Sequence, residues 1–278
     1  MIQKTYSTPI ETARNYYNSK DANNFYTATW GGEDIHIGIY EKENEPVGRA
    51  SRRTVEKIAS LTDLNEQSHI LDIGCGYGGP ARYLAKTRGC YVDCLNLSEV
   101  QNQRNWELTQ QQGLTAKIRI IDGSFEDMPI EDQQYDLVYS QDALIHSGDR
   151  QKVLQEVHRV LKPQGKFIFT DPMQGDDCPQ QALKPVLERI HLYSMGSIGF
   201  YTKTAHLFGF ETIEVIEMTN HLITHYQRIL EESEQRYQEL LDICDKDYLD
   251  RMRVGLNHWI QAGQRGYLSW GILHFRKK

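Results

Sequence analysis

The sequence predicts an α/β protein with a doubly wound, mostly parallel sheet of seven strands. From His69 onward, short apolar runs alternate with segments of helical periodicity, and a glycine cluster follows the first apolar run. Strands that alternate with helices of this length form a parallel sheet covered on both faces. The predicted strands are 69–74, 91–97, 117–122, 135–141, 166–171, 211–218 and 265–275.

The predicted helices divide the chain into three parts. They are expected at 9–19, 49–61, 79–88, 98–113, 149–161, 181–195, 201–208 and 221–262. We expect an N-terminal lid with its helices at 1–65, a ligand-binding core at 66–175, and cap helices with the last strands at 176–278. The long helical region before the final strand predicts a helical cap inserted at that point.

Bulk properties exclude several classes of protein. The formal net charge of −7 argues against nucleic-acid binding, which uses a basic face. No apolar run has the length of a membrane span, so we expect no membrane partner. The five cysteines are odd in number and contain no C-x-x-C pair, which predicts a reduced, cytoplasmic protein without structural zinc.

A glycine-rich turn follows the first predicted strand. It reads Asp72-Ile73-Gly74-Cys75-Gly76-Tyr77-Gly78-Gly79. Glycines at a strand-to-helix turn let the backbone approach a ligand closely, next to the unpaired N–H groups of the helix. The spacing also fits the fingerprint of nicotinamide-dependent dehydrogenases. Asp72 favours another ligand, because a buried carboxylate needs donors or a cation, such as the ammonium of S-adenosylmethionine.

A second segment, Asp122-Gly123-Ser124-Phe125, ends the third predicted strand. Ligands of doubly wound sheets bind outside the carboxyl ends of the strands, so this segment is expected beside the glycine turn. Asp122 can accept a hydrogen bond from an adenine amino group, and the backbone of Ser124 or Phe125 can meet the ring edge. The two segments in this order predict a methyltransferase that binds S-adenosylmethionine.

The second predicted strand ends without the acidic residue that usually grips ribose hydroxyls. Asn96 stands at that position, followed by Leu97, and we expect Asn96 and Gln101 to share the ribose contact. An amide donates and accepts hydrogen bonds, but without charge assistance. This departure also counts against nicotinamide dinucleotides.

The chain resembles the sarcosine/dimethylglycine N-methyltransferases of glycine-betaine synthesis over almost its full length. The segments that carry the resemblance are FYTATWGGEDIHIGIY (25–40), ILDIGCGYGGPARYLA (70–85), CLNLSEVQNQRN (94–105), DGSFEDMP (122–129), YSQDALIHSGDR (139–150), KFIFTDPMQ (166–174), MGSIGFY (195–201) and GLNHWIQAGQRGYLSWGILHF (255–275). The resemblance implies a class I methyltransferase fold, with the N-terminal segment closing over the sulfonium. It further implies conversion of dimethylglycine, and of sarcosine, to betaine.

Related N-terminal segments also occur in phosphoethanolamine methyltransferases and cyclopropane-fatty-acid synthases. The sequence shows no cluster of Lys and Arg for a phosphate and no apolar interfacial helix for lipid. A methyltransferase of another small amine and a non-catalytic S-adenosylmethionine-binding protein stay as alternatives.

Several residues are predicted to serve the chemistry. His146, after the fourth strand, is expected to accept the acceptor's proton or to hydrogen-bond the acceptor, and Gln141 to contact the cofactor. Aromatic rings attract cations, so Tyr26, Trp30 and Tyr201 are expected to surround the sulfonium and the product ammonium. Gly38 is expected to offer its N–H to the methionyl carboxylate.

The segment Asp171-Pro172-Met173 ends the fifth predicted strand. Pro172 and Met173 are expected to form an apolar wall against the methyl groups of the acceptor. The acceptor's carboxylate then needs another partner, for which His36, Tyr201 and Arg82 are the alternatives. His221 and His225 have a spacing that can hold a metal, but no third ligand is evident, so no metal site is predicted.

Overall fold

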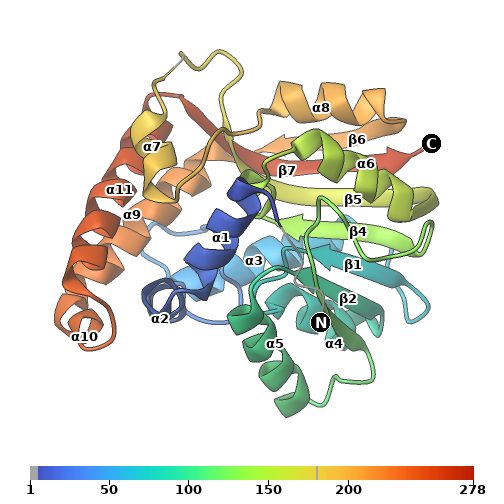
Figure 1. Cartoon of the computed structure of the whole chain (residues 1–278), viewed down its shortest axis with the longest axis horizontal. Coiled ribbons are helices and arrows are strands. Elements are labelled where there is room, and N and C mark those ends of the chain that lie inside the picture. Colours follow the sequence, from blue (N-terminus) through green and yellow to red (C-terminus); the bar gives the residue numbers. More distant parts are fainter. Residues whose placement is uncertain (1–5, 180) are drawn as a thin grey trace.

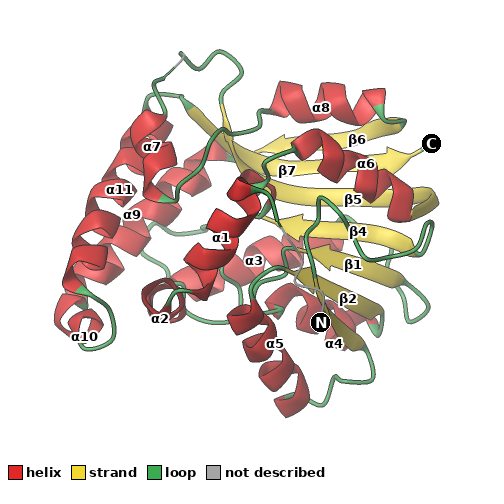
Figure 2. Cartoon of the chain, in the orientation of Figure 1, coloured by secondary structure: helices red, strands yellow, loops and turns green. Residues whose placement is uncertain are grey.

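The computed structural model describes residues 6–179 and 181–278. Its centre is one seven-stranded sheet with the order β3-β2-β1-β4-β5-β7-β6 (Figures 1 and 2). The strands are β1 His69–Ile73, β2 Tyr91–Asn96, β3 Ile118–Asp122, β4 Tyr135–Gln141, β5 Leu161–Gln174, β6 Phe210–Glu217 and β7 Leu268–Lys277. The predicted fold class is therefore confirmed, strand for strand.

The first five strands run parallel, whereas β7 lies antiparallel between β5 and β6. The strand order reverses at β1, since the chain builds outward to β3 on one side and to β4 and β5 on the other. Such a reversal leaves a crevice at the carboxyl ends of the central strands, where doubly wound sheets bind ligands.

Helices cover both faces of the sheet. On one face, α3 (Val47–Ser60) and α4 (Gly79–Arg88) pack through Ile58 and Leu84 onto apolar residues of β1 and β2. On the other face, α6 (Arg150–Val160) and α8 (Ile198–Leu207) pack through Val157 and Ala205 onto β4, β5 and β7. The remaining core helix, α5 (Glu99–Gln111), lies against β3.

The lid and the cap lie beyond the carboxyl ends of the parallel strands (Figure 1). The lid consists of α1 (Thr8–Asn18) and α2 (Lys20–Thr29), and α2 was not predicted because its sequence lacks a clear apolar stripe. The cap consists of α9 (Thr219–Gln235), α10 (Tyr237–Leu241) and α11 (Lys246–Gln264), inserted between β6 and β7 as predicted. The short helix α7 (Lys184–Arg189) packs on α11.

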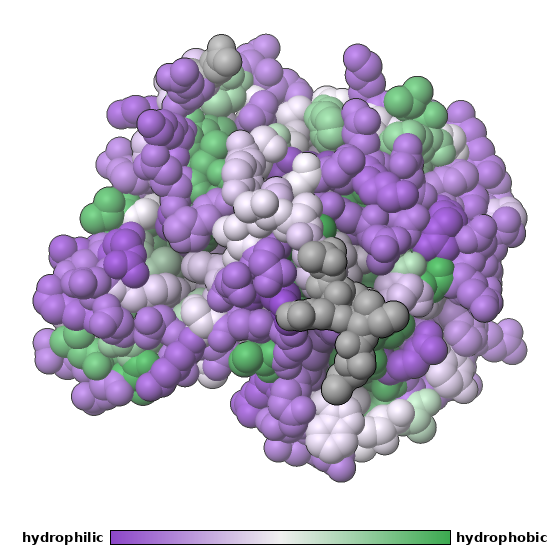
Figure 3. Space-filling view, viewed as in Figure 1, coloured by the Kyte–Doolittle hydropathy of each residue, from purple (hydrophilic) through white to green (hydrophobic). Residues whose placement is uncertain are grey.

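The lid and the cap share one apolar cluster that contains Phe25, Trp30, Leu222 and Trp259. They are therefore packed on each other, although about 190 residues separate them in the chain. The division at residues 65 and 175 stays a prediction. In the described part of the chain, no helix combines the length and apolarity that a membrane span needs, and the face in Figure 3 is mostly hydrophilic.

Candidate active site

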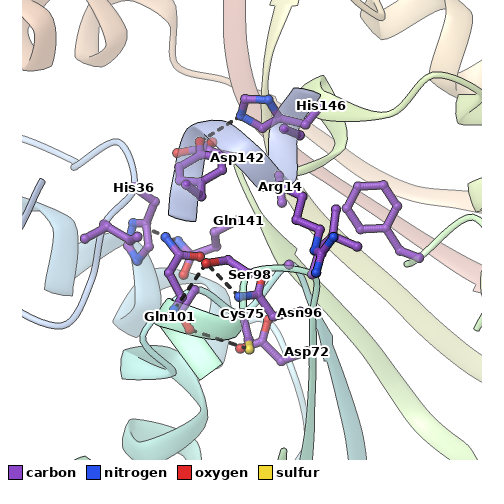
Figure 4. A pocket seen from close by; sticks show the side chains of 18 of the residues that line it. Arg14, His36, Asp72, Cys75, Asn96, Ser98, Gln101, Gln141, Asp142 and His146 are labelled. Carbon is purple, nitrogen blue, oxygen red and sulfur yellow. Dashed lines mark hydrogen bonds between the residues drawn. The ribbon is translucent and has the colours of Figure 1, made fainter. Parts of the chain in front are cut away.

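A pocket lies at the carboxyl ends of β1, β2 and β4, beneath α1 (Figure 4). Its lining combines residues from the glycine turn, the β2 end, the β3 turn, the β4 end and the lid. Twelve of the predicted site residues line it: His36, Asp72, Gly74, Gly76, Asn96, Leu97, Gln101, Gly123, Ser124, Phe125, Gln141 and His146. The fold thus brings together most of the residues selected from the sequence.

The glycine turn has a backbone that other residues adopt with difficulty. Gly74, Gly76 and Gly78 have φ angles of 73°, 52° and 72°, in the left-handed region that favours glycine. A Cβ atom on Gly74 would lie 2.4 Å from the Cβ of Ala143, which follows β4. Glycine is therefore required both for the turn and for the close approach of β1 and β4 at the pocket floor.

Asp72 supplies a buried carboxylate to this floor. Its side chain is 2% exposed, and its Oδ2 atom has no hydrogen-bond partner among the described residues. Burial raises the pKa of the Asp72 carboxyl to about 8. An unpaired buried carboxylate that faces a pocket is suited to a ligand that carries a positive charge or several N–H donors.

The end of β2 forms the second part of the pocket. The Asn96 amide donates to Oε1 of Gln101 at 3.1 Å, and Ser98 caps α5 by accepting from the Gln101 N–H. Neighbouring Gly123 donates its N–H to the Asn96 carbonyl at 3.2 Å, which ties the β3 turn to β2. The amide pair is thus held in place and offers neutral polar groups for a sugar.

The end of β4 forms the third part. Gln141 lies 3.3 Å from Nδ1 of His36, measured from its Nε2 atom. Asp142, at φ 54°, accepts from the Ile37 N–H at 2.6 Å and from the Trp270 indole N–H at 2.8 Å. Burial lowers the pKa of His36 to about 3, so this ring is neutral at physiological pH.

The lid closes the pocket with Ile10, Ala13, Arg14 and Tyr17 of α1, none of which was predicted. The Tyr17 hydroxyl lies 2.8 Å from Nε2 of His146. Burial, and then the charges of Arg150 and Arg189, lower the pKa of His146 to about 3. His146 is therefore neutral, and its ring nitrogen is engaged with the lid.

Tyr26 and Trp30 do not line the pocket but lie directly behind Tyr17. The ring of Tyr26 lies 5.9 Å from that of Tyr17 and 4.4 Å from that of Trp30, measured between centroids. Trp30 in turn contacts the ring of His225 on α9. Tyr17 is therefore the aromatic residue that faces the pocket, and the enclosure of the sulfonium by Tyr26 and Trp30 stays a prediction.

Gly38 and Asp122, two residues predicted to contact the cofactor, do not line the pocket. The Gly38 N–H donates to Nδ1 of His225 at 3.2 Å, so it is not directed at the pocket. A Cβ on Gly38 would lie 2.6 Å from Ala50, which shows that this glycine serves the packing of 36–40 on α3. Asp122 ends β3 in register with Asn96, and its exposed side chain is not part of the lining.

The histidine pair on α9 has a structural role that the metal-like spacing did not suggest. His221 accepts from the Tyr40 N–H at 3.1 Å, while His225 also lies 3.0 Å from the Tyr40 hydroxyl. Both residues thus fix the 36–40 segment to the cap. Among the residues that the structure describes, no three His, Cys, Asp or Glu side chains form a group suited to a metal ion.

The structure does not support the apolar wall expected from Pro172 and Met173. Met173 is fully buried in the cluster beneath α6 and α8. Tyr201 lies in the same cluster, and its hydroxyl donates to the Asp171 carboxylate at 2.7 Å. Because side chains alternate along a strand, Pro172 and Met173 point to opposite faces of β5 and do not form one surface. We therefore assign Met173 and Tyr201 to the core, whereas the contact of Pro172 with the acceptor stays a prediction.

The strand order, the antiparallel seventh strand and the glycine-turn pocket define a class I methyltransferase. Residues 71–169 match the family described as a methyltransferase domain. The chain is 53% identical over 266 residues to a sarcosine/dimethylglycine N-methyltransferase of Aphanothece halophytica, covering 95% of this chain and 96% of that one. One from Halorhodospira halochloris is 51% identical, with 96% of each chain covered. The chain belongs to the sarcosine/dimethylglycine N-methyltransferase family.

Solved structures agree with this assignment. A protein of Galdieria sulphuraria, assigned as a sarcosine dimethylglycine methyltransferase, is 42% identical, with a TM-score of 0.88 over 93% of this chain and 98% of that one. A phosphoethanolamine N-methyltransferase of Haemonchus contortus, solved with S-adenosylhomocysteine, has a TM-score of 0.84 at 20% identity over 98% of this chain and 60% of that one. The latter likeness concerns the fold alone.

Proposed function

We propose that the protein transfers a methyl group from S-adenosylmethionine to dimethylglycine, and to sarcosine, with glycine betaine as the final product. The unpaired Asp72 carboxylate beside the glycine turn carries this proposal. It matches the methionyl ammonium, and family membership supports an N-methylated glycine as the acceptor.

The remaining pocket residues would hold the rest of the cofactor. Asn96 and Gln101 offer an amide pair to the ribose hydroxyls. The β3 turn, with Ser124 and Phe125, would lie along the adenine ring. Asp122 remains our proposal for the adenine amino group, because it ends the strand next to Asn96. The bound cofactor would supply an electrophilic methyl group on a sulfonium.

The chain's own task is to align a neutral amine and to exclude water. A desolvated pocket disfavours the ammonium form of the acceptor, so the acceptor releases its proton to bulk water before the neutral amine binds. His36 and His146 are both neutral, so they add no positive charge beside the sulfonium. Dimethylglycine is a tertiary amine once deprotonated and has no further proton to release during attack, and the ammonium formed from sarcosine can release its proton to water after the transfer. His146 would therefore position the lid and the acceptor instead of acting as a strong base.

The aromatic group formed by Tyr17, Tyr26 and Trp30 would stabilise the quaternary ammonium as it forms. Ring faces attract cations, and a charge that is spread over methyl groups is cheaper to desolvate than an ordinary ammonium. This interaction grows as the amine becomes a cation, so it favours the transition state over the neutral acceptor.

A labelling experiment tests the proposal. The purified protein receives S-adenosylmethionine with a labelled methyl group and, separately, glycine, sarcosine, dimethylglycine or phosphoethanolamine. We expect label in betaine from dimethylglycine. Label only in phosphoethanolamine products, or binding of the cofactor without turnover of any acceptor, would overturn the proposal.

We also propose a cytoplasmic location, which is supported by the free thiols of all five cysteines.

A further inference from the structure

Arg189, the last residue of α7, is a partly buried cation whose charge is not neutralised. Among the residues that the structure describes, no carboxylate lies within ion-pair distance of its guanidinium, and its buried Nε atom has no hydrogen-bond partner. Its polar contacts are with uncharged groups, namely the Met252 sulfur, 4.0 Å from Nη1, and the side chain of Tyr226. Charged groups in such surroundings are normally paired.

The structure holds this side chain in place from three sides. Its guanidinium lies 5.0 Å from the ring centroid of Trp259 and 5.4 Å from that of Tyr226. Gly255, in the interior of α11, makes room for its stem, because a Cβ there would lie 2.3 Å from Cδ of Arg189. Glycine inside a helix lowers the stability of that helix. At position 255 it lowers the stability of α11 but leaves the space that the Arg189 side chain occupies.

Arg189 lines a cleft between α1, α7 and α11 that is separate from the cofactor pocket. Tyr16, Tyr248 and Arg251 also line it, and the buried hydroxyl of Tyr248 has no partner among the described residues. The one carboxylate in the lining, Asp21, accepts from the Asp245 N–H at 3.0 Å. The cleft thus presents unpaired N–H and O–H donors that suit an anion.

A layer of tyrosines separates this cleft from the cofactor pocket. Tyr16 lines the cleft, Tyr17 lines the pocket, and their ring centroids are 5.1 Å apart. Tyr26 contacts both rings, and its hydroxyl lies 3.4 Å from that of Tyr16. A small zwitterion with its anionic end in the cleft would therefore direct its amine toward these rings, whose other side lines the cofactor pocket.

We propose that Arg189 binds the carboxylate of the methyl acceptor, and that the cleft between α1, α7 and α11 admits this acceptor. The inference rests on the proposed function, since it requires an acceptor with a carboxylate. Arg189 then sets specificity, because amines without a carboxylate leave its guanidinium unpaired. The tyrosine layer holds the amine end, where its rings face the developing quaternary ammonium.

The three residues that the sequence suggested for this carboxylate are otherwise engaged or uncharged. Arg82 pairs with Glu33 at 2.8 Å and donates to Asn105 and to the Tyr77 carbonyl. Tyr201 donates to Asp171 in the core. His36 is neutral in the cofactor pocket. The other deeply buried arginine, Arg150, donates to the carbonyls of Ile145 and Ser194.

Steady-state kinetics of Arg189→Gln test the inference. We expect KM for dimethylglycine to rise roughly 100-fold, the size typical for loss of one partner of a buried, hydrogen-bonded charge pair. The affinity for S-adenosylhomocysteine, measured by calorimetry, should stay within about twofold, because Arg189 does not line the cofactor pocket. Arg189→Lys should recover part of the loss. Arg253→Gln, which removes an exposed charge from α11, is the matched control and should leave both constants unchanged.

Dimethylglycinamide, in which an uncharged amide replaces the carboxylate, tests whether the carboxylate is the group that Arg189 binds. The unaltered protein should prefer dimethylglycine over dimethylglycinamide by roughly 100-fold in kcat/KM, and Arg189→Gln should reduce this preference to a few fold. Gly255→Ala, which displaces the Arg189 stem, should reduce it as well. If Arg189→Gln fails to bind S-adenosylhomocysteine, the role of Arg189 is tested with Arg189→Lys and Gly255→Ala. The quantity compared is again the ratio of kcat/KM for dimethylglycine to kcat/KM for dimethylglycinamide.

An unchanged preference in these variants would overturn the role of Arg189 and leave the proposed function intact. The proposed function fails separately, if the unaltered protein methylates neither sarcosine nor dimethylglycine.

Discussion

The Tyr17 hydroxyl and Nε2 of His146 lie 2.8 Å apart, although 129 positions separate these residues in the chain. Their rings also meet edge to face, with centroids 5.1 Å apart. Tyr17 belongs to the lid and His146 to the turn after β4, so this contact joins the cover of the cofactor pocket to its wall. Further polar contacts from α1 reach α5, through Arg14 to Glu99 and Asn18 to Ser98.

Removal of the Tyr17 hydroxyl should loosen the lid without removing a ring. A side-chain hydrogen bond of this kind contributes about 1 kcal/mol, so Tyr17→Phe is expected to weaken S-adenosylhomocysteine binding by roughly 5-fold. Calorimetry measures this change. Tyr193→Phe, at a side chain that is 65% exposed, is the control. Equal affinities for all three proteins would show that the contact does not hold the pocket closed.

Asp72 should make cofactor binding depend on pH. Its carboxyl must be ionised to accept from an ammonium, and burial holds its pKa at about 8 in the free protein. Affinity for S-adenosylhomocysteine should therefore rise as the pH increases from 6 to about 8, and Asp72→Asn should bind weakly with no such rise. Calorimetry across this range gives the profile. A flat profile for the unaltered protein would contradict the ammonium contact.

The same carboxyl should lower the stability of the ligand-free protein. The pKa of Asp72 is higher in the folded state, about 8, than its ordinary value of 3.8. The favourable contribution of the protonated form is complete below pH 3.8 and is lost as the pH rises through 8. The free energy of unfolding of Asp72→Asn should therefore exceed that of the unaltered protein by a margin that grows over this range. Urea unfolding at several pH values measures the margin.

Periodicity and turn residues were sufficient to predict the sheet and most of the cofactor pocket. The glycine turn, the ends of β2 and β4 and the turn after β3 lie at the ends of strongly apolar strands. Parallel strands bring their carboxyl ends to one edge, so local sequence determined which residues would meet. Asp72 was recognisable because a carboxylate inside an apolar strand is unusual.

Residues outside this framework required the packing of distant segments. Tyr17 and Arg189 are both partly apolar side chains in short helices, and nothing in their neighbourhood marks them as functional. The role of Arg189 depends on Gly255 and Trp259, which follow more than 60 positions later. Gly255 was the one local sign that a side chain packs closely on α11, because glycine is unfavourable in the interior of a helix. Gly38 was misjudged because its N–H meets a histidine of the cap.

Asn96 and Gln101 should act as one unit in cofactor binding. Each amide orients the other through the 3.1 Å hydrogen bond between them, and residues in contact show non-additive effects. We expect Asn96→Ala and Gln101→Ala each to weaken S-adenosylhomocysteine binding by roughly 5-fold, and the double variant by clearly less than the product. Fully multiplicative effects would mean that the two side chains contact the ligand independently.

Substitutions of Met173 should show whether this residue packs the core or binds the acceptor. Its side chain is 0% exposed, in a cluster with Phe167, Phe169 and Tyr201. A charge at this position has no partner, so Met173→Arg is expected to destabilise the fold by several kcal/mol, measured by urea unfolding. Met173→Leu preserves volume and should cost less than about 1.5 kcal/mol.

The kinetic constants of Met173→Leu complete the test. Because Met173 lies on the face of β5 that α6 and α8 cover, its KM for dimethylglycine should equal that of the unaltered protein. A well-folded Met173→Arg protein that had lost dimethylglycine turnover would instead return this residue to the acceptor site. In that case the acceptor would have to reach the buried cluster beneath α6 and α8, and the cleft between α1, α7 and α11 would lose its role.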